Sequence, residues 1–129
     1  MQEPSLEEDK IAKEIVDASI HVDSQLGPGL LESVYAVCLE DVLLQKGFVV
    51  EREKPIPVKF NDKILKTGFR ADIIVNNKVL IELKSVEKFL GVHEAQILTY
   101  LKLSNLRLGF LLNFNNKLMK EGIKRFVKS

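Results

Sequence analysis

Residues 72–84, DIIVNNKVLIELK, place three charged side chains in an otherwise apolar β-hairpin. Both strands are rich in Ile, Val and Leu, and the Asn76-Asn77 pair between them is typical of a turn. Alternate residues of a strand share a face, so Glu82 and Lys84 project to the same side. Burying such charges is costly unless they pair or hold a metal ion. The hairpin therefore has either a functional site at this end or charges that simply reach solvent.

The length of the turn decides whether Asp72 and Glu82 meet. A two-residue loop would turn the two carboxylates to opposite faces, because a slip of one residue inverts every side chain. A loop of three residues, 76–78, pairs Val75 with Val79 and sets the carboxylates side by side, and Asn tolerates the left-handed backbone that such loops contain. The apolar face then carries Ile73, Val75, Val79, Ile81 and Leu83, and the charged face Asp72, Ile74, Leu80, Glu82 and Lys84. We predict this register because it leaves one face wholly apolar.

Length and composition limit the classes of protein. The 129 residues suffice for one core, and we expect a single domain over residues 1–129. A net charge of +1 gives no overall basic balance, so nucleic-acid binding would need local patches. The single Cys38 excludes an internal disulfide, and no Cys/His cluster indicates zinc. A polar, acidic beginning and the lack of a bilayer-length apolar run predict a cytoplasmic protein without membrane contact.

Periodicity and turn residues predict the other elements. Helices are expected at 6–26, 30–46 and 92–104, and strands at 48–53, 64–75, 79–84 and 108–114. Pro55 and Pro57 confine the continuation of the first strand to an edge or a bend, and Asn61-Asp62 supplies a turn. Strand, helix and strand over 79–114 imply a parallel pair with a right-handed crossover. Residues 120–127 form either a last strand or a short helix.

Glu32 is the next informative residue. On a helical wheel it shares a face with Tyr35, Ala36, Leu39 and Leu43. That placement predicts a carboxylate that points inward, toward the sheet. The alternative is that Glu32 occupies the first helical turn, where the helix dipole and free N–H groups favour a negative charge.

The helix expected at 92–104 carries a polar face. His93, Gln96 and Tyr100 fall at i, i+3 and i+7 on this face. The helix follows the Glu82–Lys84 strand directly, so the crossover could lay its polar face beside the charged end of the sheet. Gln96 and Tyr100 could then position a phosphate, a base or the lysine, whereas His93 is expected to be a surface residue.

Two motifs resemble known families. Residues 29–35, GLLESVY, match the signature of the GxxExxY family. Asp72, the ELK of residues 82–84 and the QILTY of residues 96–100 resemble the RecB-like branch of the PD-(D/E)XK nuclease superfamily, with Ala71 in the place of Pro. The resemblance covers nearly the whole chain. It implies an α/β, restriction-endonuclease-like three-layer fold, in which helices flank a central mixed β-sheet with an α-β-β-β-α-β core.

The resemblance also implies a site and a reaction. The catalytic residues would be Glu32, Asp72, Glu82 and Lys84, and the substrate-positioning residues Gln96 and Tyr100. Asp72 and Glu82, joined by Glu32, would hold Mg²⁺ or Mn²⁺, since hard cations prefer oxygen ligands. The expected function is metal-dependent hydrolysis of phosphodiester bonds in nucleic acid, with DNA as the first expected substrate and RNA as the second.

Two alternatives stay open, because a fold alone does not define a function. The chain could be a catalytically silent module that binds nucleic acid or protein, although the presence of all four charged residues argues against this. It could also be a subunit that selects its substrate through a homodimer or a partner protein. The small size, without an appended recognition module, favours that arrangement.

Overall fold

The computed structural model describes residues 3–128, apart from the side chain of Thr67, and it has the predicted hairpin register. In β2 (Lys63–Val75) and β3 (Val79–Lys84), Val75 pairs with Val79 and Ile73 with Ile81. Asn76 and Asn77 in the three-residue loop have φ of 51° and 53°, the left-handed backbone that Asn accepts. The three-residue loop is thus confirmed.

The hairpin belongs to a mixed sheet in the order β1-β2-β3-β4-β5. The further strands are β1 (Val50–Phe60), β4 (Leu108–Asn113) and β5 (Ile123–Val127). β3 and β4 run parallel, joined through α3 (Gly91–Ser104), and the other neighbouring pairs are antiparallel. The predicted parallel pair is therefore confirmed. The last segment contains both elements considered for it, a short 3₁₀ helix η1 (Met119–Gly122) followed by β5.

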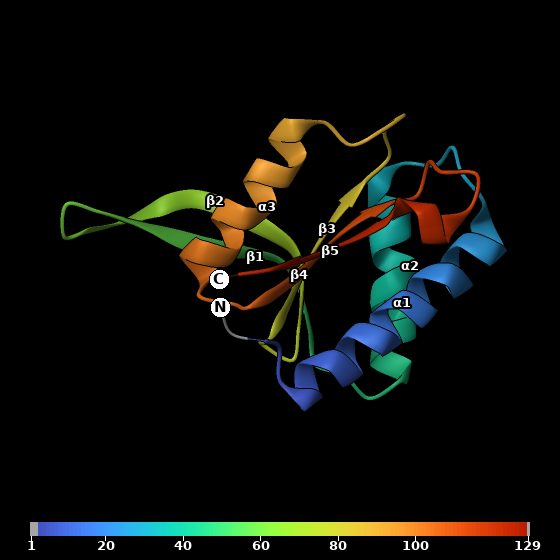
Figure 1. Cartoon of the computed structure of the whole chain (residues 1–129), viewed down its shortest axis with the longest axis horizontal. Coiled ribbons are helices and arrows are strands. Elements are labelled where there is room, and N and C mark those ends of the chain that lie inside the picture. The colour runs from blue at the N-terminus through green and yellow to red at the C-terminus, as the bar shows by residue number, and fades with distance from the viewer. Residues whose placement is uncertain (1–2, 129) are drawn as a thin grey trace.

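Helices cover the two faces of the sheet (Figure 1). α1 (Leu6–Leu26) and α2 (Glu32–Gln45) pack on the face that carries Ile73, Val75, Val79, Ile81 and Leu83. α3 packs on the opposite face, where Ile97 and Leu101 contact Ile74 and Leu80 in a smaller core. These layers form the mixed α/β architecture expected of a restriction-endonuclease-like fold, and the alternation predicted for the hairpin explains why both faces need a helical cover.

α2 begins at Glu32, two residues later than predicted, and a buried tyrosine organises the loop before it. The Tyr35 hydroxyl donates to the Gly27 carbonyl at 2.6 Å and accepts from the Leu30 N–H at 3.1 Å. The ring is fully buried and stacks on Phe114, with the centroids 4.5 Å apart. Tyr35 therefore ties the Gly-Pro-Gly turn to the core and sets where the second helix starts.

β1 and β2 continue beyond the sheet as a two-stranded arm, which projects to the left in Figure 1. β1 passes through Pro55 and Pro57 without ending, because it lies at the edge of the sheet and an edge strand tolerates the missing N–H groups. The predicted turn closes the arm, with φ of 48° at Asn61 and 63° at Asp62. No helix within residues 3–128 is both long and apolar enough to span a bilayer.

Replacing Tyr35 by Phe should destabilise the fold. The substitution keeps the stacked ring but leaves the Gly27 carbonyl and the Leu30 N–H without their shared partner, which typically costs about 1 to 3 kcal/mol. Urea unfolding followed by circular dichroism measures the loss. Unchanged stability of Tyr35→Phe would contradict a structural role for this hydroxyl.

Candidate active site

Asp72 and Glu82 lie side by side where β2 and β3 approach the end of the sheet. They follow directly in register from the paired Ile73 and Ile81. The Leu83 N–H donates to Asp72 Oδ2 at 2.8 Å. Glu82 is only 6% exposed, and within residues 3–128 its Oε1 atom has no hydrogen-bond partner. A buried ionised carboxylate with an unsatisfied oxygen is unfavourable, so this atom calls for a proton or a cation.

The pair strongly perturbs the titration of Glu82. Burial raises the pKa of Glu82 from 4.5 to about 9, and the hydrogen bond and charge of Asp72 add to the rise. The positive charge of Lys84, two residues along the same strand, lowers the Glu82 pKa and so opposes this effect. In the metal-free protein at neutral pH, Glu82 is therefore protonated.

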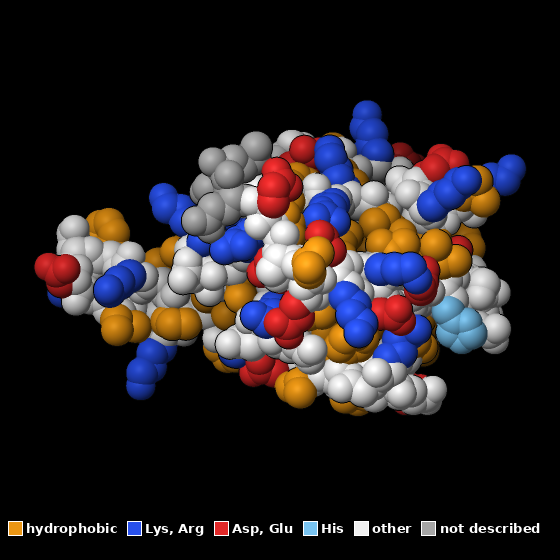
Figure 2. Space-filling model, turned by 60° about the horizontal axis from the view of Figure 1, so that its bottom comes forward, with side chains coloured by type: hydrophobic (Ala, Val, Ile, Leu, Met, Phe, Trp, Pro, Cys, Tyr) orange, Lys and Arg blue, Asp and Glu red, His pale blue; other side chains and the backbone are white. Residues whose placement is uncertain are grey.

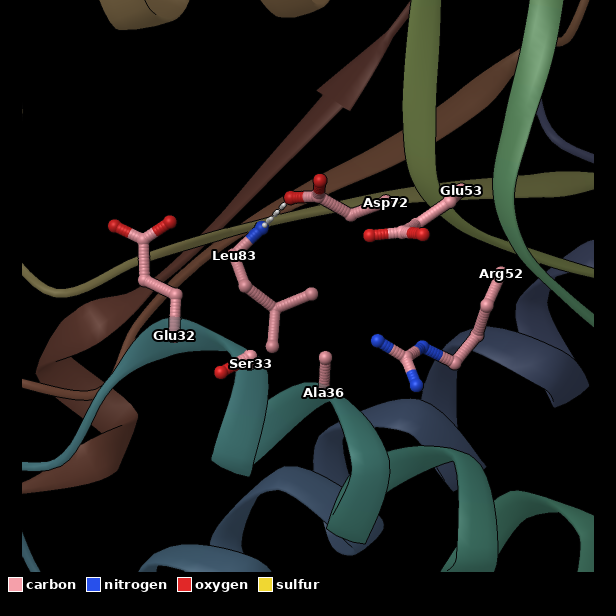
Figure 3. Close-up of a pocket in the computed structure, with 7 residues that line it drawn as sticks. All are labelled: Glu32, Ser33, Ala36, Arg52, Glu53, Asp72 and Leu83. Atoms are coloured by element: carbon pink, nitrogen blue, oxygen red, sulfur yellow. Dashed lines mark hydrogen bonds between the residues drawn. The ribbon is translucent and has the colours of Figure 1, made fainter.

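A hollow of about 280 Å³ opens beside Asp72. α2, β1, β2 and β3 line it with Glu32, Ser33, Ala36, Arg52, Glu53, Asp72 and Leu83 (Figure 3). In the close-up, Arg52 and Glu53 point into the hollow from one side, and Glu32 lies on the other side of Leu83. Asp72 is half-buried, so it connects this open space with the buried Glu82.

Glu32 is exposed and not buried against the core, which differs from the inward position that the helical wheel predicted. Its side chain is exposed at the first residue of α2, and Oε2 accepts from the Ser85 N–H at 3.2 Å. Within the described part of the chain, no three acidic, His or Cys side chains form a group that could hold one metal ion. The carboxylate nevertheless reaches the end of the sheet and lines the same hollow as Asp72, so the prediction is wrong for the burial of Glu32 and not for its direction. The helix-dipole alternative explains this position.

α3 brings one of its two candidate residues to the carboxylates. Tyr100 stacks on Phe69 of β2, with ring centroids 3.7 Å apart and planes 7° from parallel. Burial raises the pKa of Tyr100, and the charges of Glu82 and Asp72 raise it further, which places the phenol within their field. Gln96 is exposed one turn earlier on the helix, and His93 is partly exposed and accepts from the Leu90 N–H at 3.0 Å.

A buried asparagine that the sequence analysis missed shapes the loop after Lys84. Asn113 is 1% exposed at the end of β4. Its Nδ2 donates to the Val86 carbonyl at 2.8 Å, and its Oδ1 accepts from the Val86 N–H at 3.1 Å. Asn113 pairs with Lys84 in the parallel ladder, so it holds the chain that leaves the site.

Arg52 and Glu53 also line the site, although no sequence pattern predicted them there. The ladder pairs on either side, Arg52 with Ile73 and Lys54 with Ala71, set Glu53 opposite Asp72. Glu53 has φ of 49°, unusual for a residue with a side chain. Only the pairing of the first strand with the hairpin reveals these neighbours, because the four-residue run of charges at 51–54 has no spacing that distinguishes it from a solvated edge.

Comparisons with known proteins agree with this geometry. A family model described as the PD-(D/E)XK nuclease superfamily matches residues 9–126. The chain belongs to the PD-(D/E)XK nuclease superfamily. The crystal structure of SSO0001 superposes with a TM-score of 0.54 at 20% identity, over 93% of this chain and 59% of that one, a likeness of fold alone. No curated protein matches the chain significantly. Asp72 and the ELK of residues 82–84 fit the acidic parts and the lysine of the superfamily motif.

The stability of the metal-free protein should fall as the pH rises. The folded-state pKa of Glu82 lies above its unfolded value, so the stabilising contribution is complete below pH 4.5 and is lost as the pH rises through about 9. Glu82→Gln, which is neutral at every pH, should flatten this dependence. Urea unfolding in EDTA at a series of pH values measures it, with Glu87→Gln at an exposed position as the control. Equal pH dependence in wild type and Glu82→Gln would contradict the assignment.

Proposed function

We propose that this chain is a nuclease that hydrolyses phosphodiester bonds with Mg²⁺ or Mn²⁺ held by Asp72 and Glu82. The observation that carries the proposal is the buried Glu82 Oε1 atom, which lacks a partner beside a second carboxylate. Structural carboxylates at this depth normally find donors. Membership of the superfamily makes nuclease chemistry the first expectation for such a pair.

The donor set fits a hard divalent cation. Mg²⁺ is usually bound through one or two carboxylates and keeps several waters. Asp72 and Glu82 supply the carboxylates, and the open hollow beside Asp72 leaves room for waters and for a phosphate. Glu32 at the rim is a candidate for contact through a water rather than for direct ligation, since it stands outside the buried pair.

Each side chain of the site then has a defined role. A bound cation would lower the pKa of a water and neutralise charge on the scissile phosphate. Glu82 would release its proton on binding the cation, so affinity for the cation would rise with pH. Lys84 would orient the attacking water or stabilise the developing negative charge as a point charge.

The walls of the site would orient the substrate. Tyr100, held against Phe69, and Gln96 on the same helix would align the nucleic-acid strand beside the carboxylates. Arg52 points into the hollow, and within residues 3–128 its buried Nε has no hydrogen-bond partner. A phosphate oxygen of the substrate would satisfy that donor, since Arg is well suited to phosphate.

Within the superfamily, we assign the chain to the GxxExxY family and to the RecB-like branch. The assignment is supported by GLLESVY at 29–35 and QILTY at 96–100. The structure suggests why the first motif needs its members: Glu32 reaches the Ser85 N–H after β3, and Tyr35 holds the preceding loop. We expect the chain to act as one cytoplasmic domain on DNA before RNA, either alone or with a second chain.

Divalent ions should stabilise the protein through the carboxylate pair. Mg²⁺ or Mn²⁺ that binds only the folded state should raise Tm by mass action. At a free ion concentration of 100 times Kd, the free energy of unfolding should rise by about 2.7 kcal/mol. Asp72→Asn should abolish the rise. Asp62→Asn at the tip of the arm is the matched control and should keep it. Differential scanning calorimetry with and without the ion gives the answer, and an equal rise in wild type and Asp72→Asn would place the ion elsewhere.

Purified protein should cleave a polynucleotide only with a divalent ion. Lys84→Ala should lose activity on the order of 10²-fold or more, the scale of one preorganised donor, while the ion still raises Tm because Lys is not a ligand. Lys102→Ala, an exposed cation on α3, is the matched control. Single- and double-stranded DNA and RNA are the substrates.

Identical purification of all variants controls for contaminating nuclease. Activity that persists in both Glu82→Ala and Lys84→Ala would exclude this site. Silence on every substrate, with ion binding intact, would favour the binding-module alternative.

A further inference from the structure

The arm formed by residues 55–70 projects well away from the layered body (Figure 1). Its strands pair as Val58 with Leu65 and Phe60 with Lys63, and a two-residue turn closes it. The space-filling view shows basic and apolar side chains along this projection (Figure 2). A two-stranded hairpin that leaves the core is marginal in water on its own, so its exposed surface needs an explanation.

The arm is the basic part of a nearly neutral chain. Residues 55–70 carry four cations, Lys59, Lys63, Lys66 and Arg70, against the single acid Asp62, so their net charge is +3. Because the whole chain carries +1, the remaining residues carry −2. All four cations are exposed. The ion pairs within residues 3–128 all lie in the body of the protein, and none of them includes a residue of the arm.

Apolar side chains are exposed at the tip. Phe60 is 63% exposed and Ile64 is 66% exposed, on either side of the turn. They cover no core within the described residues, since neither belongs to the two apolar clusters. A free cation beside an exposed aromatic ring is the combination that single-stranded nucleic acid uses, with phosphates on the cation and bases on the ring.

The base of the arm joins the candidate active site directly. Arg70 precedes Asp72 by two residues on β2, and Phe69 stacks on Tyr100. A second hollow of about 350 Å³ lies here, lined by Pro55, Lys66, Gly68, Phe69 and Arg70. Arg70, Lys66 and Lys63 are thus spaced along β2 from the carboxylate pair to the tip, and Lys59 adds a fourth cation on β1.

A register shift between Ile56 and Val58 sets where the arm leaves the sheet. Gly68 lies opposite this shift, and a Cβ there would collide with the Ile56 carbonyl and the Val58 side chain. Bulges of this kind bend a strand pair and fix its direction. The bulge at the base of the arm therefore fixes the direction in which the arm leaves the sheet.

We propose that this arm binds the phosphate backbone of a nucleic-acid strand and guides it toward the carboxylate pair. The proposal rests on the proposed function for the identity of the substrate, but binding by the arm requires no chemistry. From Asp72 to the tip is roughly nine residues of strand, or about 30 Å, which matches about nine nucleotides at 3.4 Å each. The tip side chains Phe60 and Ile64 would contact bases at the far end of this path.

A polyanion fits the arm better than a second copy of the chain. Contact between two arms would bring together two surfaces that each carry +3, and the opposite signs that promote association would be missing. A nucleic-acid strand supplies one negative charge per nucleotide and bases for the exposed tip. The charge distribution thus selects the partner.

Binding can be measured without cleavage. Fluorescence anisotropy in EDTA, with labelled strands of about 30 nucleotides of single- or double-stranded DNA or RNA, gives affinity as a function of KCl concentration. The arm variant replaces Lys59, Lys63, Lys66 and Arg70 by Gln. The control variant replaces Lys10, Lys102, Lys117 and Lys120, four exposed cations outside the arm, by Gln and so has the same net charge. Circular dichroism melting confirms that both variants are folded.

In the arm variant, the slope of log K against log salt should become shallower by about three units. Each of the four cations removed accounts for about 0.7 to 0.9 of this change. The control variant should keep most of the wild-type slope. Equal slopes in the two variants, or no binding by wild-type protein in EDTA, would overturn the proposal. A wild-type dimer that Phe60→Ser converts to a monomer in sedimentation would also overturn it, since the tip would then be a self-association surface.

Cleavage measured on the same proteins separates this proposal from the proposed function. Metal-dependent cleavage with KM raised in the arm variant and kcat kept supports both. Cleavage that is equal in the wild type and the arm variant would support the nuclease function and contradict the proposed role of the arm. Binding that depends on the arm, without cleavage of any substrate, would support the role of the arm and contradict the nuclease function.

Discussion

The register of β2 against β3 is the constraint on which the core and the site both depend. One pairing, Val75 with Val79, directs an unbroken apolar face toward α1 and α2. The same pairing brings Asp72 beside Glu82. A slip of one residue would expose the apolar face and separate the carboxylates at once. Stability of the fold and assembly of the acidic pair are therefore two results of one geometric choice.

The acidic pair is tolerated because the metal-free protein keeps Glu82 neutral. Burial next to an acid would otherwise leave an uncompensated charge inside the sheet, a state that folded proteins avoid. Protonation relieves the repulsion in the absence of a cation, and it leaves an oxygen of Glu82 without a partner. The sheet therefore holds the two carboxyl groups side by side while Glu82 is neutral.

Polar contacts between distant segments complete the surroundings of the pair. Glu32 reaches the Ser85 N–H, Asn113 holds Val86, and Tyr35 holds the turn before α2. Each contact satisfies a backbone group in a loop near the end of the sheet. These loops are therefore held in position, and the open side of the site faces the hollow between α2 and β1.

The amino-acid sequence by itself determined the elements, the hairpin register and the pairing of Asp72 with Glu82. These features depend on local periodicity and turn chemistry, and alternation along a strand carries a side chain to one face wherever the strand lies. The family motifs extended that analysis to the α/β sheet flanked by helices and to the superfamily.

Only the tertiary structure decided the contact of Glu32 with Ser85, the neighbours Arg52 and Glu53, and the projection of the arm. Each depends on how segments far apart in sequence pack. A helical wheel of α2 contains no information on the Ser85 N–H, which donates to Glu32 from a loop 53 residues away in the sequence. Pro55 and Pro57 predicted an edge or a bend, but only the pairing of β1 with β2 placed the bulge at which the strands leave the sheet. The energies that choose such arrangements come from contacts between elements, and these do not exist until the elements meet.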